Sequence, residues 1–344
     1  MSEQSGTLAG ALRHNRHGKT QLIVQTIFLA LDFISMGIRL WSRRLQKTRL
    51  QANDFIILAA QIVVIAEYAM TVVLIVDCGL GLHTDEVERI GGPERLVAFR
   101  KVLYVMNLMW LTPVSLIKIS ILHFYTVVFR KKRFQQLVYA LIGVNIVFLI
   151  TATFSNVFFC TPPAKQWLLT VPGHCNDATA IYVVLSSIDL GMDIIVILLP
   201  MPILWRLHLA TAKKISLTIV FGLGILIIII TAIRITFVSD VATPDQTYTF
   251  TRIALFSALT PQMGIINANL PLSAPVLRKF FSTPILSTTV ENSNRTMSSN
   301  IELKRLREGE HYPAAAESTR SLENDPYLGG SLPLSPLSIS HVLR

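Results

Sequence analysis

Apolar residues in this chain come in long blocks separated by short polar or basic segments, rather than alternating as they do in half-buried strands. The blocks approach the roughly 20 residues that one helix needs to cross about 30 Å of hydrocarbon. Helices are therefore the expected spanning elements. The hydropathy pattern predicts an all-α, polytopic bundle of seven transmembrane helices near residues 22–42, 54–77, 102–125, 136–158, 179–204, 215–238 and 251–275.

The last predicted span, 251–275, is the most polar of the seven. Pro261 and Pro271 interrupt it, and Asn267 and Asn269 add amide side chains. Proline is tolerated in membrane helices when neighbouring groups satisfy the freed backbone. We therefore expect this helix to face the other helices.

Basic residues are shared unequally between the loops. Segments 43–53, 129–134 and 206–214 are strongly basic, whereas the alternate loops hold fewer basic residues and the first of these is also acidic. Because basic loops stay in the cytoplasm, this asymmetry predicts an extracellular amino terminus. The predicted parts are an extracellular tail, 1–21, a seven-span domain, 22–280, and a disordered cytoplasmic tail, 281–344, rich in Ser, Thr, Asn and Pro.

The overall composition agrees with a membrane protein. Hydrophobic residues make up 51% of the 344 residues and charged residues only 15%, which is too apolar for an ordinary soluble domain of this size. The net charge of +10 is explained by the basic loops, so we expect membrane lipids and no nucleic acid as partners. We expect a multi-pass protein of the plasma membrane rather than of an internal membrane.

Ionisable residues inside the predicted spans are the candidate site residues, because a charge at the bilayer centre costs roughly 2.5–3.5 kcal/mol on insertion scales. Depth along the helices, at about 1.5 Å per residue, suggests which charges can meet. We expect Arg234 to meet Asp189, and Lys118 to meet Asp193 or Asp32. Such pairs either fix helix register or form a ligand or proton site. The candidates are Asp32, Glu67, Lys118, Asp189, Asp193 and Arg234.

The three cysteines are interpreted from their predicted positions. Cys160 and Cys175 fall in the second outer loop, on the oxidising side of the membrane, so we expect a disulfide between them. Cys78 ends the second span at the same surface and either competes for one of these partners or stays free. Neither histidine pairs nor short cysteine spacings are present, so we expect no metal site.

Several local strings resemble the fungal rhodopsin-like integral membrane proteins of filamentous ascomycetes. This group includes the satratoxin-cluster type membrane protein and relatives of pathogenicity-linked fungal receptors. The resemblance covers residues 22–280, and one position differs, since Gln262 stands where relatives usually carry a glutamate. The matching strings are Asn53-Asp54, GLGLHT at 79–84, KISILHFY at 118–125, CTPPAKQW at 160–167 with Cys175, LPMPILW at 199–205 and the region of Arg234.

The leading interpretation is a receptor-like protein that binds a small or lipophilic ligand in an outer-half cavity between spans 2, 3, 5, 6 and 7, with a cytoplasmic signalling partner. No cofactor is expected, and no retinal, because the last span has no lysine between Arg252 and Lys279 for a Schiff base. The sequence contains none of the common catalytic motifs of soluble enzymes. The alternatives are a membrane-embedded enzyme of secondary metabolism, such as a cyclase that uses Glu67, Asp189 or Asp193 as an acid, and a transporter.

Overall fold

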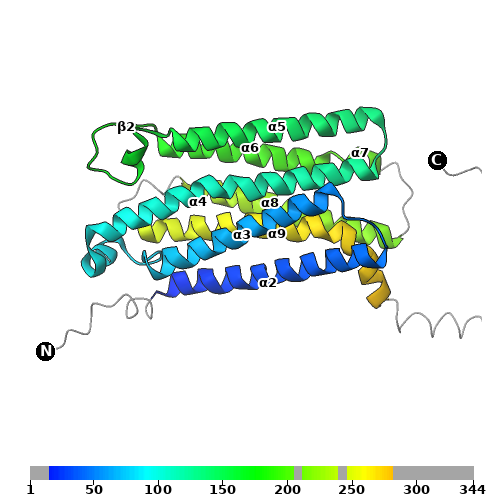
Figure 1. The fold of residues 1–344 in the computed structure, drawn as a ribbon, viewed down its shortest axis with the longest axis horizontal. Coiled ribbons are helices and arrows are strands. Elements are labelled where there is room, and N and C mark those ends of the chain that lie inside the picture. The colour runs from blue at the N-terminus through cyan, green and yellow to red at the C-terminus, as the bar shows by residue number, and fades with distance from the viewer. Residues whose placement is uncertain (1–14, 205–210, 239–245, 282–344) are drawn as a thin grey trace, which may run out of the picture. The chain divides into compact units, whose positions relative to one another are not determined.

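The computed structural model describes residues 15–204, 211–238 and 246–281, and within this part the chain forms a bundle of long helices (Figure 1). Each predicted span coincides with one of them, so the all-α seven-helix fold is confirmed. The small elements are the helical turns η1 (Pro163–Gln166) and α7 (Met201–Leu204) and a two-stranded hairpin, in which β1 (Cys160–Thr161) pairs antiparallel with β2 (His174–Cys175). The spanning helices are α2 (Arg16–Leu45), α3 (Ala52–Val76), α4 (Thr84–Val128), α5 (Lys132–Val157), α6 (Ala178–Leu198), α8 (Thr211–Val238) and α9 (Gln246–Phe281).

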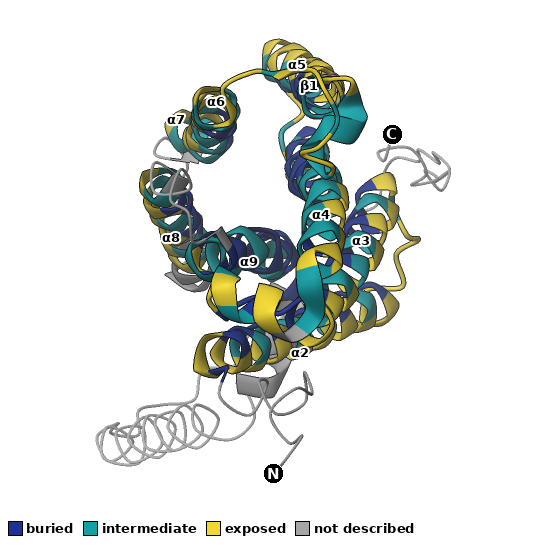
Figure 2. Cartoon of the chain, turned by 90° about the vertical axis from the view of Figure 1, so that its left-hand side faces the viewer, coloured by how far each residue is buried: buried dark blue, intermediate teal, exposed yellow. Residues whose placement is uncertain are grey.

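Six of the described helices are long and apolar enough to cross a bilayer, and α9 is the one that falls short. Its position explains its polarity. It packs against α2, α3, α4 and α8, and Figure 2 shows it among those helices. Gln262 and Asn269 on α9 are both buried, so this helix is lined by protein rather than by lipid, as its sequence indicates.

The outward faces of the other helices carry large apolar side chains. Ile27 on α2, Ile62 on α3 and Val147 on α5 are all more than half exposed, and exposed residues follow the outer faces of the helices in Figure 2. A soluble protein rarely exposes apolar patches of this extent, whereas hydrocarbon solvates them. The protein is therefore a multi-pass membrane protein.

All seven helices begin before their predicted residue, and α2 and α4 show the largest differences. Helix α2 starts at Arg16 rather than at residue 22, because Asn15 caps it: the Asn15 side chain accepts a hydrogen bond from the Gly18 amide and donates another to the Leu80 carbonyl. The predicted tail 1–21 is thus too long, and its first 14 residues lie outside the described part. Hydropathy detects only the apolar part of a helix, so it missed this polar first turn.

Helix α4 also begins well before residue 102, in a region predicted to be a loop. It starts at Thr84 and contains one non-helical residue, Gly92, whose φ of 73° followed by Pro93 produces a kink. The turn that leads into it, 79–82, contains Gly79 and Gly81, both at positive φ. A side chain on Gly81 would collide with Asn15, so close packing requires glycine there.

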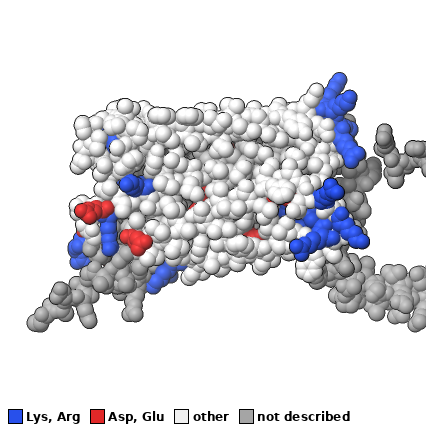
Figure 3. All heavy atoms as spheres, in the orientation of Figure 1, with Lys and Arg blue, Asp and Glu red and all other residues white. Residues whose placement is uncertain are grey.

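Charge is distributed along the bundle as the orientation argument requires. In Figure 3 basic side chains gather at the end that holds the connections 46–51 and 129–131, while the end that holds the hairpin carries both acidic and basic side chains. We call these the inner end and the outer end. The cytoplasmic placement of the inner end stays a prediction, and the predicted tail beyond residue 281 lies outside the described residues.

Candidate functional site

The centre of the bundle contains a buried ion-pair cluster formed by α4 and α6. The Lys118 ammonium lies 2.6 Å from Asp189 Oδ1 and 3.1 Å from Asp193 Oδ1, and it also donates to the Asp189 carbonyl oxygen at 3.0 Å. Asp189 is almost fully buried, and Asp193 is 13% exposed at its side chain. One turn of helix places both acids on one face, so a single lysine can bind both.

Arg234 does not pair with Asp189, contrary to the expectation from the sequence. Its guanidinium is fully buried and donates to the Tyr182 hydroxyl at 3.1 Å and to the Ser186 hydroxyl at 3.0 Å. The guanidinium carbon also lies 3.8 Å from the centroid of the Trp110 ring, a cation–π contact. Two hydroxyls and an aromatic face therefore replace the expected carboxylate.

The end of α6 explains the different pairing. The sequence predicted this span to reach residue 204, but α6 ends at Leu198 and a short separate turn follows. Asp189 lies about 14 Å along α6 from Leu198, close to the rise of about 15 Å along α4 between Lys118 and Val128. Arg234, about 6 Å from the outer end of α8, instead meets residues one and two turns further out on α6.

A cavity of about 290 Å³ lies toward the outer end of the bundle, where Gln166 of η1 forms part of its wall. Its walls come from α4, α5, η1, α6 and α9. Of the spans predicted to line it, the third, fifth and seventh do so, the fourth contributes unexpectedly, and within the described residues neither the second nor the sixth does. Most of the wall is apolar or aromatic, with a few amides and hydroxyls, and among the described residues Arg100 is the one charged residue that lines it. The lining residues are Arg100, Leu103, Tyr104, Asn107, Trp110, Leu111, Asn156, Phe159, Gln166, Ala178, Ile181, Tyr182, Leu185, Ser186, Thr249 and Phe250.

A smaller cavity of about 40 Å³ lies beside the first, and the two share Asn107, Trp110, Tyr182 and Phe250 as lining residues. Glu67 of α3 lines the smaller one. The Glu67 side chain is 7% exposed, and its Oε1 has no hydrogen-bond partner among the described residues. This space is large enough for water molecules, which would satisfy such an orphan oxygen.

Two other buried polar atoms belong to side chains that line the smaller cavity. They are Gln25 Nε2 and Gln262 Oε1, from α2 and α9. The Gln262 amide nitrogen donates to the Gln25 carbonyl, which joins these helices. Gln262 is thus part of this polar group.

Asp32 takes no part in either cavity or in the Lys118 cluster. It is completely buried on α2, and neither carboxyl oxygen has a hydrogen-bond partner within the described part of the chain. The expectation that Asp32 is an alternative partner for Lys118 is therefore wrong. The two acids on α6 already occupy that ammonium.

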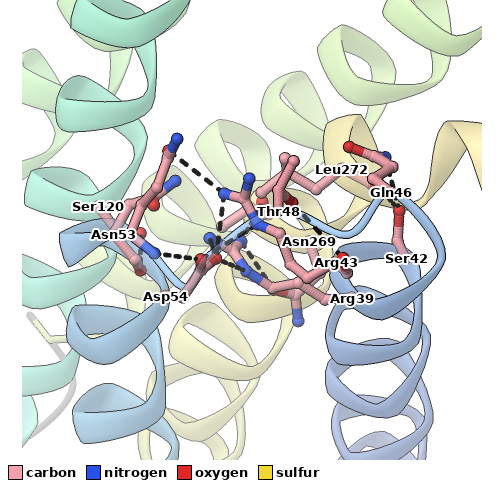
Figure 4. Close-up of polar contacts among 12 residues, drawn as sticks. Arg39, Ser42, Arg43, Gln46, Thr48, Asn53, Asp54, Ser120, Asn269 and Leu272 are labelled. Atoms are coloured by element: carbon pink, nitrogen blue, oxygen red, sulfur yellow. Dashed lines mark hydrogen bonds and ion pairs between the residues drawn. The ribbon is translucent and has the colours of Figure 1, made fainter.

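A second ion-pair network joins the inner ends of α2, α3 and α9 (Figure 4). Asp54 accepts from Arg39 at 2.7 Å and from Arg43 at 3.1 Å, and the Arg39 guanidinium also donates to the Ala268 carbonyl and to the Asn269 side chain. All three charged groups are buried. Asp54 belongs to one of the strings that carry the family resemblance, but neither it nor Arg39 was a candidate site residue, because both lie within a few residues of a predicted span end, where charges are common.

Cys160 and Cys175 form a disulfide across the β1–β2 hairpin, as the sequence predicted. The bridge closes the loop whose Phe159 and Gln166 line the outer cavity. Cys78 is free and buried among apolar side chains, and this burial raises the pKa of its thiol. A thiol of this kind is unreactive.

The described residues contain no group of three or more histidine, cysteine or acidic side chains that could hold a metal ion. The chemistry available at the two cavities is therefore that of a buried cation, hydroxyls, amides, aromatic faces and one unpaired carboxyl group. Such a set binds and orients small molecules, and its carboxyl group can exchange a proton with one.

Comparison with known proteins identifies the family. The family model described as the fungal rhodopsin domain matches residues 38–279. The chain belongs to this family. The match covers the inner end of α2, five complete helices and α9 up to residue 279, so the resemblance based on the local strings is confirmed.

Curated relatives of this fungal rhodopsin-domain protein carry different kinds of name. A polyenoic acids biosynthesis gene cluster protein, Ba17b, from Metarhizium anisopliae is 24% identical over 74% of this chain and 72% of its own length. A SAT4 family membrane protein from Emericella nidulans is 26% identical over 65% and 58%. The receptor GIN3 from Arthrobotrys oligospora is 25% identical over 58% of this chain and 47% of its own length. No solved structure matches.

Sequence reasoning missed three residues of the outer site. Tyr182 and Ser186 lie on the same face of α6 as Asp189, at helical spacing, and that periodicity was the available signal. Trp110 was visible as an aromatic residue deep within a span, but only the fold brings it against Arg234. Neutral hydroxyls carry no charge that would mark them inside an apolar segment.

Proposed function

We propose that this protein is receptor-like and binds a small lipophilic ligand, without retinal, in the outer cavity. The cavity itself carries the proposal. Its volume lies near the lower end of the roughly 300–1,000 Å³ typical of small-molecule sites, and apolar walls with a few convergent polar groups are usual for such sites. The disulfide-closed loop forms part of the wall and supports a fixed shape.

The relatives support the two halves of this proposal. GIN3 is named a receptor, and Ba17b is named for a biosynthesis cluster of polyenoic acids, which are small metabolites. From GIN3 we take the receptor-like activity. From Ba17b we take only the expectation of a small, largely apolar compound. The plasma membrane is the compartment that suits a receptor with an outward-facing cavity.

Helix α9 provides a route from the cavity to the inner end. Phe250 lines the cavity, Trp110 donates from its indole to the Ser257 carbonyl at 2.9 Å, and Asn269 joins the Arg39 network about 18 Å further along the helix. A ligand that displaces Trp110 would thereby act on the inner network. A cytoplasmic signalling partner at the basic inner end is the expected recipient.

The test is a matched pair of substitutions on α6. Ile181→Trp places an indole in the cavity, whereas Val184→Trp places the same group on the face where Val184 is 56% exposed. Lipophilic metabolites that copurify with the full chain are identified by mass spectrometry. We expect Ile181→Trp to lose a bound metabolite that wild type and Val184→Trp retain, and equal retention by all three would reject the cavity as the site.

A membrane-embedded enzyme is the second candidate, favoured by Glu67. A buried carboxyl group with an unpartnered oxygen, beside a cavity that shares four residues with the larger one, is placed to protonate a substrate. Glu67→Gln keeps the size of the side chain and removes the acid. Loss of one cyclised product in a strain that carries Glu67→Gln, with membrane abundance unchanged, would support the enzyme, whereas unchanged metabolites would favour the receptor.

A further inference from the structure

We propose that the ligand of the outer cavity is an amphipathic carboxylic acid, whose carboxylate binds at the hydroxyls of Tyr182 and Ser186 with Arg234 behind them. This inference rests on the proposed function, since it names the chemical class that the same cavity accepts. It comes from three features of the site: the direction of the hydrogen bonds, the charges around the cavity and the spacing of the donors.

The hydrogen bonds of Arg234 leave two hydroxyl hydrogens available. A guanidinium has only donors, so the oxygens of Tyr182 and Ser186 both act as acceptors toward Arg234. Each hydroxyl keeps its own hydrogen, and neither donates to another protein group within the part of the chain that the structure describes. Because both side chains line the outer cavity, these hydrogens are available to a ligand there.

Donation from a guanidinium makes each hydroxyl a better donor in turn, because hydrogen bonds in a chain polarise one another. The acceptor that gains most from such a donor is an anionic oxygen, since charge-assisted hydrogen bonds are roughly twice as strong as neutral ones. Arg234 is therefore a positioning residue: it need not touch the ligand to favour an anion at the two hydroxyls.

The charges around the cavity favour the same class. Arg234 makes no ion pair with a carboxylate of the described residues, and its Nε has no hydrogen-bond partner there. The acids nearest to it along α6, Asp189 and Asp193, are both bound by Lys118. Arg100 adds a cation to the wall of the cavity, and among the residues that the structure describes no aspartate or glutamate lines it.

The spacing of the donors distinguishes a carboxylate from a larger anion. Tyr182 and Ser186 are four residues apart and so lie one above the other on one helix face. Two donors that bind the same guanidinium suit the two oxygens of a carboxylate, whereas a phosphate monoester has three terminal oxygens to satisfy. The apolar wall, which includes Leu103, Ile181 and Leu185, accommodates the hydrocarbon part of the acid.

The experiment measures binding of three probes with the same chain to the purified full-length protein in detergent: dodecanoic acid, dodecanol and dodecyl phosphate. Each probe is titrated while thermal unfolding is followed, because a ligand that binds the folded state raises the unfolding temperature. We expect dodecanoic acid to bind about tenfold more tightly than dodecanol, the usual size of a hydrogen bond to a charged group. Binding of dodecyl phosphate as tight as that of the acid would instead assign the site to a phospholipid head group and overturn the proposal.

Substitutions locate the preference on α6. Ser186→Ala and Tyr182→Phe each remove one hydroxyl, and we expect the preference for acid over alcohol to fall to about threefold or less. Arg100→Gln provides a variant away from the buried cluster, and it should also reduce the preference. The controls are Ser187→Ala, whose exposed hydroxyl donates to the Val183 carbonyl on the same helix, and Tyr139→Phe on the exposed face of α5.

The outcomes separate this inference from the function on which it rests. If none of the probes binds, both are wrong. If dodecanol binds as tightly as dodecanoic acid, the cavity takes lipophilic ligands but the acid assignment is wrong. If the acid is preferred and this preference survives in Ser186→Ala, Arg100→Gln and the controls alike, the carboxylate binds elsewhere and the assignment to these residues is overturned. Should Tyr182→Phe fail to fold, Ser186→Ala and Arg100→Gln still decide.

Discussion

The Lys118 ammonium lies within 3.1 Å of two carboxylates, those of Asp189 and Asp193, yet its contacts with them are unequal. Asp189 has the shorter contact and also offers its carbonyl oxygen, whereas Asp193 is more exposed and lines a small cavity of about 50 Å³ that water can enter. The cluster therefore has a principal partner and a secondary one.

This inequality predicts different effects for two matched substitutions. Asp189→Asn should lower the amount of folded protein in the membrane more than Asp193→Asn, because it removes the charge closest to a buried lysine. Breaking a buried pair in this way typically costs about 3–5 kcal/mol. Fluorescence of a tagged protein in isolated membranes measures the abundance. Equal abundance of the two variants, or a greater loss for Asp193→Asn, would show that Asp189 is not the principal partner of Lys118.

The inner-end network makes a second prediction about stability. Asp54→Asn leaves Arg39 and Arg43 buried without their carboxylate, so we expect a loss of about 3–5 kcal/mol and a clear fall in the thermal unfolding temperature in detergent. Arg43→Gln should cost less, because Arg39 keeps Asp54, Asn269 and the Ala268 carbonyl. A larger effect for Arg43→Gln would contradict the central position of Arg39.

The disulfide should order the outer loop more than it stabilises the helix bundle. Cys160 and Cys175 are 15 residues apart, and loop-entropy arguments give about 3 kcal/mol for a disulfide that closes a loop of this length. The double substitution Cys160→Ala with Cys175→Ala removes this contribution. That loss falls on the outer loop, while the helices remain packed. Limited proteolysis should cut the variant within 161–174 when wild type resists. Resistance of both proteins would mean that η1 and the α5 end hold the loop without the bridge.

Retinal should not form a pigment with this protein. A Schiff base needs a lysine beside a central pocket, and the seventh helix has none between Arg252 and Lys279. Lys118 is bound by two acids and does not line the outer cavity. Addition of retinal to purified protein is followed by visible absorbance, and the appearance of a band that hydroxylamine bleaches would refute this expectation.

The sequence predicted the fold well because hydropathy reports on lipid exposure, which decides where helices lie. It failed where helices carry polar turns: the first turn of α2 is capped by Asn15, and the outer part of α4 lies in a region predicted to be a loop. The charged candidates lie inside the bundle as expected. They could be identified because a charged residue stands out within an apolar segment of the sequence. Their partners were only partly predicted, because pairing depends on where α6 ends and on the neutral hydroxyls of Tyr182 and Ser186.

The most direct test of the central claim is to find where a lipophilic acid binds. Dodecanoic acid with a diazirine at the end of its chain is photolysed with the purified protein, and the labelled peptides are identified by mass spectrometry. Binding in the outer cavity predicts labels on α4 within 103–111 and on α6 within 181–185, removed by excess unlabelled acid and absent from Ile181→Trp. Labels confined to lipid-facing positions such as Ile62 and Val147, and unaffected by competitor, would contradict the account.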